Sequence, residues 1–391
     1  MNKSLLLILL LSLLSCRLKD ASELQTGGQG PLEEDITFYD GNGGWSEINL
    51  PGPLQRAAIF GMDVELDQNR KLHAAVILTY YDEMTRTYKQ RLSYFTNKNG
   101  SWNHYALKES DFLFAFSNYG SFKKKTLKIH IDENQNPKIV YLSEVRSAKL
   151  MSFDGEFTNE QTLQTSVSAF DTVHDVANGV LHFLFATLEN GNSKNLTYKK
   201  LNRSLEVVET KTYSFLTATK YTPHIEQKFY GGDHYIFVNG YSDGIFREKL
   251  FMMRNNDVFN IAYLDTESAM FNLVFENELF SVCYIGVGLK RYVAQINLNA
   301  IVQETTLMNF EEEYTTNRNC HVSSDGQLPV IYYDYSEYAN FLFYNFFKKM
   351  QGTMELDLDR IDLVKNVGEQ LFIGGVSLKN DSVTFYVKSK Q

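Results

Sequence analysis

One short pattern recurs along the chain and limits the possible folds more than any other feature of the sequence. Each copy has a short run, a turn rich in Asn, Asp or Gly, and an apolar run that begins about seven or eight residues after the first polar position, which predicts a β-hairpin. The clear copies are ELDQNRKLHAAVI from Glu65, HIDENQNPKIVYL from His130, HDVANGVLHFLFA from His174 and HVSSDGQLPVIYY from His321. The weaker copies are EQKFYGGDHYIFV from Glu226, NLVFENELFSVCY from Asn272 and LVKNVGEQLFIGG from Leu363.

Each predicted hairpin is followed by two more strand-like segments. The third strands are alternating apolar segments such as RLSYF, AKLMSF, EKLFMM and FLFYNFF, and a fourth strand comes after each. Corresponding points of the second strands recur about every 40 to 65 residues, which is the period of four-stranded blades. Aromatic residues make up 14% of the chain and proline occurs only 6 times, a composition that suits many half-buried strands. We therefore expect an all-β chain.

The two tryptophans of the chain indicate how the repeat begins and ends. NGGWSEINL contains Trp45 and NGSWNHYAL contains Trp102, and the second segment lies between the third and fourth strands of the first complete blade. The first segment therefore predicts the last strand of a blade that starts elsewhere. The C-terminal segments QLFIGGVSL and VTFYVKSKQ are strands with no fourth strand after them. We expect Trp45–Leu50 to join the strand Val383–Val387 and close a ring, because closure removes exposed strand edges.

The repeat resembles the β-propeller repeats of uncharacterised bacterial surface lipoproteins, in which a turn like DxNGxP precedes an aromatic-rich strand. The segment IDENQNPKIVY is the best match in this chain. The resemblance implies a single β-propeller domain over residues 36–391, with seven four-stranded blades by our count and six or eight as the alternatives. It implies a fold and not an activity, because one architecture serves many functions.

The N-terminus has the three parts of an export signal. Lys3 supplies a positive charge, Leu5–Leu14 form an almost entirely apolar run, and the small Ser15 directly precedes Cys16. The apolar run would form a helix of about 15 Å, which is roughly half of the hydrocarbon core of a bilayer. The run is therefore too short to span a membrane, and it predicts a cleaved signal.

The segment LLSC resembles the bacterial lipobox. The resemblance implies a signal peptide over residues 1–15, lipidation of Cys16, and a flexible tether over residues 16–35. Arg17 at the second mature position implies the outer membrane in the usual sorting scheme of such lipoproteins. We therefore expect a lipid-anchored protein of the bacterial cell envelope. The alternative is an ordinary secretory signal with a chance cysteine.

Charge and cysteine content exclude several function classes. The formal net charge is −9, so nucleic acid is not expected as a partner, because phosphate binding needs a basic surface. After Cys16 only Cys283 and Cys320 remain, too few for a disulfide framework or a structural zinc site. A single bridge between these two cysteines is left open.

The first candidate site is a column of polar residues at one position of the predicted innermost strands. Equal registers would place these residues at one level around the axis. A ring of imidazoles and carboxylates is able to bind a cation or a polar ligand. The favoured interpretation is hydrogen bonding between neighbouring blades, because a buried polar group needs a partner. Misalignment is the third alternative. The column consists of Glu65, His130, His174, Glu226, Asn272 and His321.

The second candidate site is the predicted loop YYDYSEYANF. Aromatic faces beside carboxylates suit sugar rings or exposed peptides, although the same residues also suit a hairpin packed on its neighbour, which is the favoured interpretation. The residues of this possible binding loop are Tyr332, Tyr333, Asp334, Tyr335, Glu337 and Tyr338.

The sequence matches the known catalytic and metal-binding motifs poorly. Asp132, Asn134 and Asn136 copy part of a calcium loop, but Pro137 replaces the required glycine, so a hairpin turn held by side-chain hydrogen bonds is favoured over a Ca²⁺ site. The segment TNKNGSW departs at two positions from the Asp box of sialidases. The sequence has no H-E-x-x-H or P-loop segment. No catalytic residue, metal or other cofactor is therefore predicted.

Two functions follow from this sequence. The first is a membrane-anchored binding or scaffolding propeller with protein or glycan partners in the envelope. The alternative is an envelope hydrolase or lyase that cleaves glycans or phosphate esters with acids converging near the axis. Two carboxylates and a basic residue that meet in a cleft near the axis would favour the enzyme, and a filled, narrow channel would favour the binding module.

Overall fold

The computed structural model describes residues 37–40, 45–50, 58–110, 126–143, 145–156, 158–189, 192–219, 225–241, 248–254, 257–263, 271–276, 279–285, 291–297, 306–310, 320–324, 329–334, 340–345, 350–358, 362–377 and 382–389. All regular elements within these ranges are β-strands, as the sequence predicted. None of the residues in these ranges belongs to a helix with the length and hydrophobicity of a membrane span. The expected signal peptide, Cys16 and the tether lie outside the described residues.

Five of the sheets each consist of four strands that follow one another in the chain and pair antiparallel. The first contains β3 (Ala58–Leu66), β4 (Leu72–Asp82), β5 (Thr87–Thr96) and β6 (Asn103–Ser110). The second contains β7 (Leu127–Ile131), β8 (Pro137–Leu142), β9 (Ala148–Phe153) and β10 (Thr158–Gln164). The third contains β11 (Val167–Asp175), β12 (Val180–Glu189), β13 (Asn192–Leu201) and β14 (Val207–Thr219). The fourth contains β15 (Ile225–Tyr230), β16 (Asp233–Tyr241), β17 (Glu248–Arg254) and β18 (Asp257–Tyr263). The fifth contains β19 (Phe271–Glu276), β20 (Leu279–Ile285), β21 (Arg291–Asn297) and β22 (Thr306–Phe310).

Two further sheets combine strands from both ends of the chain. One contains β23 (Cys320–Ser324), β24 (Pro329–Asp334), β25 (Asn340–Asn345), β26 (Met350–Glu355) and, parallel to β26, β1 (Thr37–Asp40). The other contains β27 (Leu363–Val367), β28 (Gln370–Val376), β29 (Val383–Ser389) and β2 (Ser46–Asn49). The sequence did not predict the addition of β1, which covers the edge of β26.

The pairing of β2 with β29 confirms the prediction made from the two tryptophans. The strands are antiparallel, with Ser46 opposite Val387 and Asn49 opposite Thr384. The Thr384 hydroxyl donates to Asn49 Oδ1 at 2.6 Å, and the Leu50 amide donates to the Val383 carbonyl at 2.8 Å. An N-terminal strand therefore completes the C-terminal sheet.

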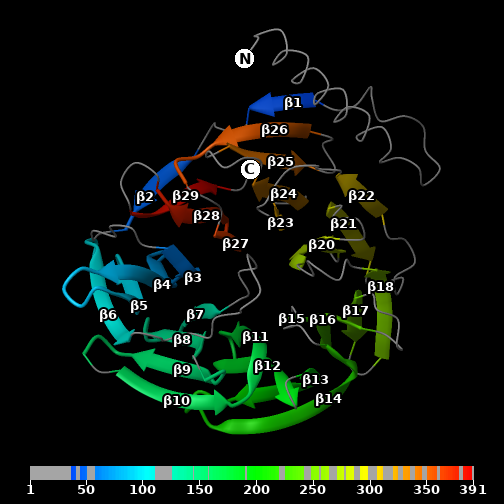
Figure 1. The fold of residues 1–391 in the computed structure, drawn as a ribbon, viewed down its shortest axis with the longest axis horizontal. Helices are drawn as coiled ribbons and strands as arrows, with labels where there is room; N and C mark the ends of the chain where they lie inside the picture. The colour runs from blue at the N-terminus through cyan, green and yellow to red at the C-terminus, as the bar shows by residue number, and fades with distance from the viewer. Residues whose placement is uncertain are drawn as a thin grey trace.

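The sheets stand around a common centre (Figure 1). The first strands β3, β7, β11, β23 and β27 lie near the centre, and β6, β10, β14, β18 and β22 lie at the rim. Radial sheets with the first strand innermost are the architecture of a β-propeller. The β-propeller class inferred from the repeat is therefore confirmed.

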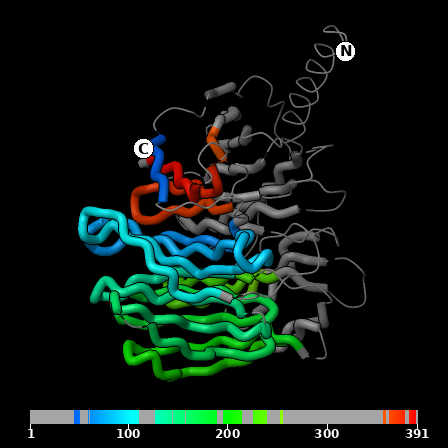
Figure 2. The backbone as a smooth tube through the Cα atoms, turned by 60° about the vertical axis from the view of Figure 1, so that its left-hand side comes forward, coloured from blue at the N-terminus to red at the C-terminus, as the bar shows by residue number. Residues whose placement is uncertain are grey.

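The sheets lie one upon another (Figure 2), and the clusters of buried hydrophobic residues lie between neighbouring sheets. Ala75 and Ile77 of β4 share one core cluster with Ile129 and Ile139 of the next sheet. A second cluster joins the second sheet to the third, and a third joins the third sheet to the fourth. Strands such as β8 are mostly buried because both of their faces are covered by neighbouring sheets.

A five-residue turn recurs at the strand connections. A side-chain oxygen of the first residue accepts the amide of the fifth, and the fourth residue has a positive φ, as in Arg70 (58°) and Gln135 (62°). Side-chain hydrogen bonds of this kind replace the backbone partners that a tight turn lacks. The turns begin at Asp67, Asp132, Ser143 and Asn202.

Candidate functional site

The structure places all six residues of the predicted polar column on the first strand of a sheet. The hairpin registers, however, put them at different distances from the turn. In each hairpin one cross-strand residue pair lies next to the turn and closes it. Glu65, His130 and His174 each belong to the next residue pair, one step farther from the turn. Glu226 and Asn272 lie four pairs beyond the closing pair, and His321 lies three pairs beyond it. Three consecutive sheets therefore share one level, whereas the single level expected for all six residues is not observed.

The two imidazoles of this level contact each other. The ring centroids of His130 and His174 are 5.7 Å apart, and the rings meet edge to face. His130 Nε2 forms a hydrogen bond with the Thr172 hydroxyl of the neighbouring sheet, and its side chain is buried. Burial, followed by the charge of Lys365, lowers the pKa of His130 to about 3. His130 is therefore a neutral imidazole that links two sheets.

Lys365 of β27 is a charged member of the centre that the sequence analysis did not select. Its Nζ donates to Asp63 Oδ1 at 2.9 Å, to the Val64 carbonyl at 2.7 Å, and lies 3.3 Å from Glu65 Oε2. These contacts join the sheet that ends the chain to the first four-stranded sheet. Burial by itself would lower the pKa of Lys365, but the carboxylates of Asp63 and Glu65 hold it above its usual value.

Asp63 connects three sheets. Its Oδ2 accepts the Ile129 amide of β7 at 3.0 Å while Oδ1 accepts the Lys365 ammonium of β27. The side chain of Asp63 is 2% exposed. Burial would raise its pKa, but Lys365, Lys128 and the Ile129 amide lower it below the ordinary value. The ionised carboxylate therefore acts as a support between neighbouring first strands.

The same support recurs two sheets further on. Asp171 of β11 accepts the backbone amide of Gln227 in β15 at 2.8 Å. The Gln227 side chain returns two hydrogen bonds of 3.1 Å, to the carbonyls of Asp171 and His182. The sequence signal for both supports was an aspartate two or three residues before a column residue, in DVE at Asp63 and in DTVH at Asp171.

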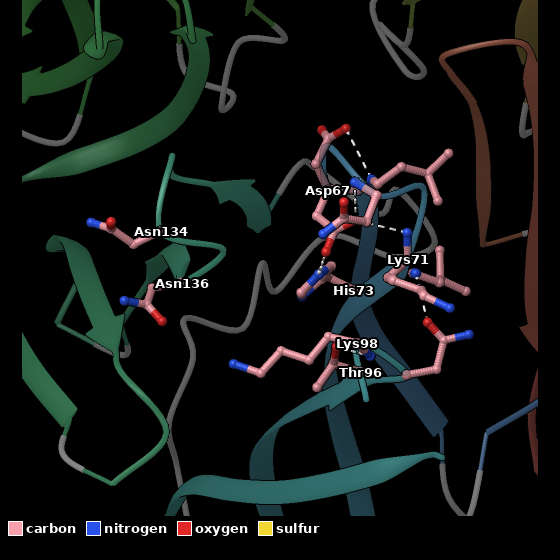
Figure 3. A network of polar contacts seen from close by, with 12 residues as sticks. Asp67, Lys71, His73, Thr96, Lys98, Asn134 and Asn136 are labelled. Atoms are coloured by element: carbon pink, nitrogen blue, oxygen red, sulfur yellow. Dashed lines mark hydrogen bonds and ion pairs between the residues drawn. The ribbon is translucent and has the colours of Figure 1, made fainter. Parts of the chain in front are cut away.

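A second polar network closes the β3–β4 hairpin (Figure 3). The Asp67 carboxylate accepts the Asn69 and Lys71 amides, both at 2.8 Å, and its Oδ2 lies 3.5 Å from His73 Nε2. His73 Nδ1 lies 2.6 Å from the Tyr94 hydroxyl. Burial lowers the pKa of His73 although Asp67 opposes the shift. His182 and Tyr198 repeat the histidine and tyrosine contact at 2.7 Å, so this pair belongs to the repeat.

The calcium-like segment forms the five-residue turn. Asp132 Oδ1 accepts the amides of Asn134 and Asn136 at 2.9 Å, and Oδ2 lies 3.3 Å from Lys138 Nζ. These contacts match the favoured interpretation of a turn held by local hydrogen bonds. Within the ranges that the structure describes, no three His, Cys, Asp or Glu side chains are arranged to hold a metal ion.

The predicted aromatic loop begins later than the sequence indicated. Tyr332, Tyr333 and Asp334 form the end of β24, where they pair with β23 and β25. The continuous run of apolar and aromatic residues from Val330 to Tyr333 extends the strand into the predicted loop. Tyr335, Glu337 and Tyr338 lie outside the described residues.

The two cysteines for which a single bridge was left open, Cys283 and Cys320, lie on strands of different sheets. Cys283 is in β20, opposite Asn272, and Cys320 begins β23. β20 and β23 are in contact.

No protein-family model matches the chain, and no curated protein matches it. Among solved structures, it resembles the acylaminoacyl peptidase of Pyrococcus horikoshii with 9% identity and a TM-score of 0.49, over 86% of this chain and 53% of the peptidase. The chain thus spans about half the length of that enzyme. It also resembles the β-propeller domain of the Trilobed protease from Pyrococcus furiosus, with 9% identity and a TM-score of 0.48, over 86% of this chain and 95% of the other. The SapL1 lectin, in complex with alpha methyl fucoside, is similar over 75% of this chain and 95% of the lectin, with 8% identity and a TM-score of 0.42. These likenesses concern the fold alone.

Proposed function

We propose that this chain is a lipid-anchored β-propeller of the bacterial cell envelope, with seven blades, that binds a protein or glycan partner. The N-terminal lipobox supports the anchor and the envelope location. The seven sheets found among the described residues support the blade number. The binding role rests on how the ionised groups at the centre are used.

The carrying observation is the network of Asp63 and Lys365. Both oxygens of Asp63 are hydrogen-bonded, one to a backbone amide and one to the lysine, and the lysine also contacts Val64 and Glu65. A general base must be free to accept a proton from a substrate, and a nucleophile must reach the reacting atom, whereas these groups hold three sheets together. The centre therefore serves as a rigid support that presents the outer faces of the propeller to partners.

A second candidate function has one specific observation in its favour. Asp63, Glu65 and Lys365 bring two carboxylates and a basic residue together near the axis. Glu65 and Lys365 are also partly exposed, at 27% and 23% of their side-chain surfaces. This convergence is the arrangement expected of an envelope hydrolase, with Glu65 as the accessible acid or base.

One experiment separates the two functions. The purified protein is incubated with peptidoglycan sacculi and with outer-membrane vesicles, and co-sedimentation is measured. The same preparation is assayed with p-nitrophenyl glycosides and p-nitrophenyl phosphate, beside Glu65→Gln. We expect retention by one envelope fraction and no turnover. Turnover that is lost in a normally folded Glu65→Gln protein would establish the hydrolase instead.

A further inference from the structure

Five aromatic side chains meet where the third sheet faces the fourth. The Phe229 ring lies 4.3 Å from the His182 ring and stacks on His234 at 4.3 Å with an interplanar angle of 8°. The ring centroid of Tyr198 lies 5.1 Å from that of His234, and the ring centroid of Tyr213 lies 6.5 Å from that of His234. The aromatic cluster, as it is called below, consists of His182, Tyr198, Tyr213, Phe229 and His234.

Hydrogen bonds hold the imidazoles of this aromatic cluster in place. His182 Nδ1 is bonded to the Tyr198 hydroxyl at 2.7 Å, and His234 Nε2 is bonded to Gln227 Oε1 at 3.1 Å. The Gln227 amide group is in turn tied to the backbone of the third sheet. The rings therefore have fixed orientations before any ligand arrives, which lowers the entropic cost of binding.

Phe229 is the exposed member of the aromatic cluster. The residue is 40% exposed, whereas Tyr198 is 4% exposed and His182 is 9% exposed. Phe229 lies one pair beyond the closing pair of its hairpin, the position that Glu65, His130 and His174 occupy in the three preceding sheets. A large ring thus faces solvent at a level where the neighbouring sheets carry polar groups.

Charged side chains of both signs act on the two imidazoles of the aromatic cluster. Burial lowers the pKa of His182, and burial followed by His182 and Lys211 lowers the pKa of His234 to about 4, so both imidazoles are neutral near pH 7. The mixture does not favour a strongly anionic or cationic ligand, but it supplies donors and acceptors for hydroxyl groups. The charged side chains that act on the two imidazoles include Asp171, Asp175, Lys200, Glu209 and Lys211.

We propose that Phe229 and the aromatic cluster behind it bind a neutral pyranose ring of an envelope glycan. One face of a pyranose is made of C–H groups, which pack on the negative face of an aromatic ring. The hydroxyl groups at the edge of the same sugar are matched by the charged side chains that act on the two imidazoles beside Phe229. This inference rests on the proposed binding function and assigns it a ligand class and a position.

The test uses saturation-transfer difference NMR on the purified protein with the methyl glycosides of glucose, galactose, mannose, fucose and N-acetylglucosamine. Isothermal titration then measures the Kd of every glycoside that responds. Phe229→Leu keeps apolar packing against the imidazoles but has no ring face, and it should weaken binding about tenfold. Phe229→Trp should retain or tighten binding. The matched control is Tyr88→Leu, which removes an aromatic ring that is 66% exposed on another sheet.

Three outcomes would overturn the inference. They are an absence of saturation transfer from the wild-type protein to any glycoside, an affinity that Phe229→Leu leaves unchanged, and an affinity that Tyr88→Leu lowers equally. Melting temperatures identify any variant that has lost its fold. If Phe229→Leu is unfolded, the affinity of Phe229→Trp is the test, and a weaker affinity than that of the wild type overturns the inference. Co-sedimentation with sacculi and vesicles is measured on the same proteins. Envelope binding that persists without glycoside binding overturns only the site, whereas wild-type protein that binds no envelope fraction counts against the proposed function itself.

Discussion

Replacing Lys365 by methionine tests whether the central network holds the ring together. Methionine keeps most of the length and apolar stem of the lysine but has no charge. The change removes the donor at 2.9 Å from Asp63, whose carboxylate stays 2% exposed and keeps only the Ile129 amide as a partner. An uncompensated buried charge is the main consequence.

The magnitude follows from the burial of the two partners. Breaking a buried ion pair by removing one partner typically costs about 3 to 5 kcal/mol. Lys365 is 23% exposed, so water reaches one side of the site and we expect a loss near the lower limit, about 3 kcal/mol. Asp63→Asn in the same chain should recover part of this loss, because the charge without a partner is then gone.

The pH dependence has a defined sign. The pKa of Asp63 is held below its ordinary value, so its contribution to stability is present above the unfolded pKa of about 4 and is lost as the pH falls through the folded pKa. The difference between wild type and Lys365→Met should therefore be largest near neutral pH and should shrink below about pH 4.

Urea denaturation measures the free energy of unfolding, with far-UV circular dichroism and tryptophan fluorescence as separate probes of two-state behaviour. Lys211→Met is the matched control, because Lys211 forms a 2.7 Å ion pair with Glu209 while its side chain is 56% exposed. Such a surface pair is worth about 0 to 1 kcal/mol. A loss for Lys365→Met no larger than that of the control would refute the supporting role of the network.

Four further predictions concern other parts of the chain. His130→Ala should destabilise the protein by about 1 to 3 kcal/mol, because Thr172 loses its buried hydrogen-bond partner. The contrary result is a wild-type melting temperature that rises with added divalent metal, and a His130→Ala protein that loses this rise at little cost in stability. That result would support a ligand site. Removing residues 1–50 should cause aggregation, since β29 then has an unpaired edge, and a monomeric product with an unchanged melting temperature would contradict this. Cys16→Ser should abolish palmitate labelling and membrane fractionation, and persistent labelling would disprove the anchor. Gln135→Gly should raise the free energy of unfolding by about 0.5 to 1 kcal/mol, because glycine adopts the positive φ of this turn without steric cost. Urea denaturation measures the change. A loss of stability would show that the Gln135 side chain stabilises the fold by more than its backbone strain destabilises it.

The spacing of turns and apolar runs was sufficient to predict the hairpins and the pairing of an N-terminal strand with the C-terminal sheet, although not the addition of β1. The hairpins that begin near Glu65, His130 and His174 are present, and Trp45 precedes the strand that completes the C-terminal sheet. Hairpins can be predicted from a sequence because they depend on side-chain alternation and on turn residues that lie a few positions apart.

The level of each polar residue depended on turn length, which the aligned sequences concealed. Five residues connect β3 to β4, whereas only Gly231 and Gly232 connect β15 to β16. Glu65 and Glu226 both precede a second-strand histidine by the same spacing, yet the shorter turn lengthens the pairing and places Glu226 three pairs farther from the turn than Glu65. Phe229 consequently occupies the place that the alignment assigned to Glu226.

The contacts between sheets were decided by the tertiary structure alone. Asp63 and Lys365 lie at opposite ends of the sequence, and nothing in the local pattern of either strand indicates that their side chains meet. The approach of Phe229 to His182 likewise depends on how the fourth sheet is rotated against the third. A repeat determines how each sheet forms, because its pairing is local. The chemistry between sheets follows from their packing, since that is where buried charges and rings acquire their partners.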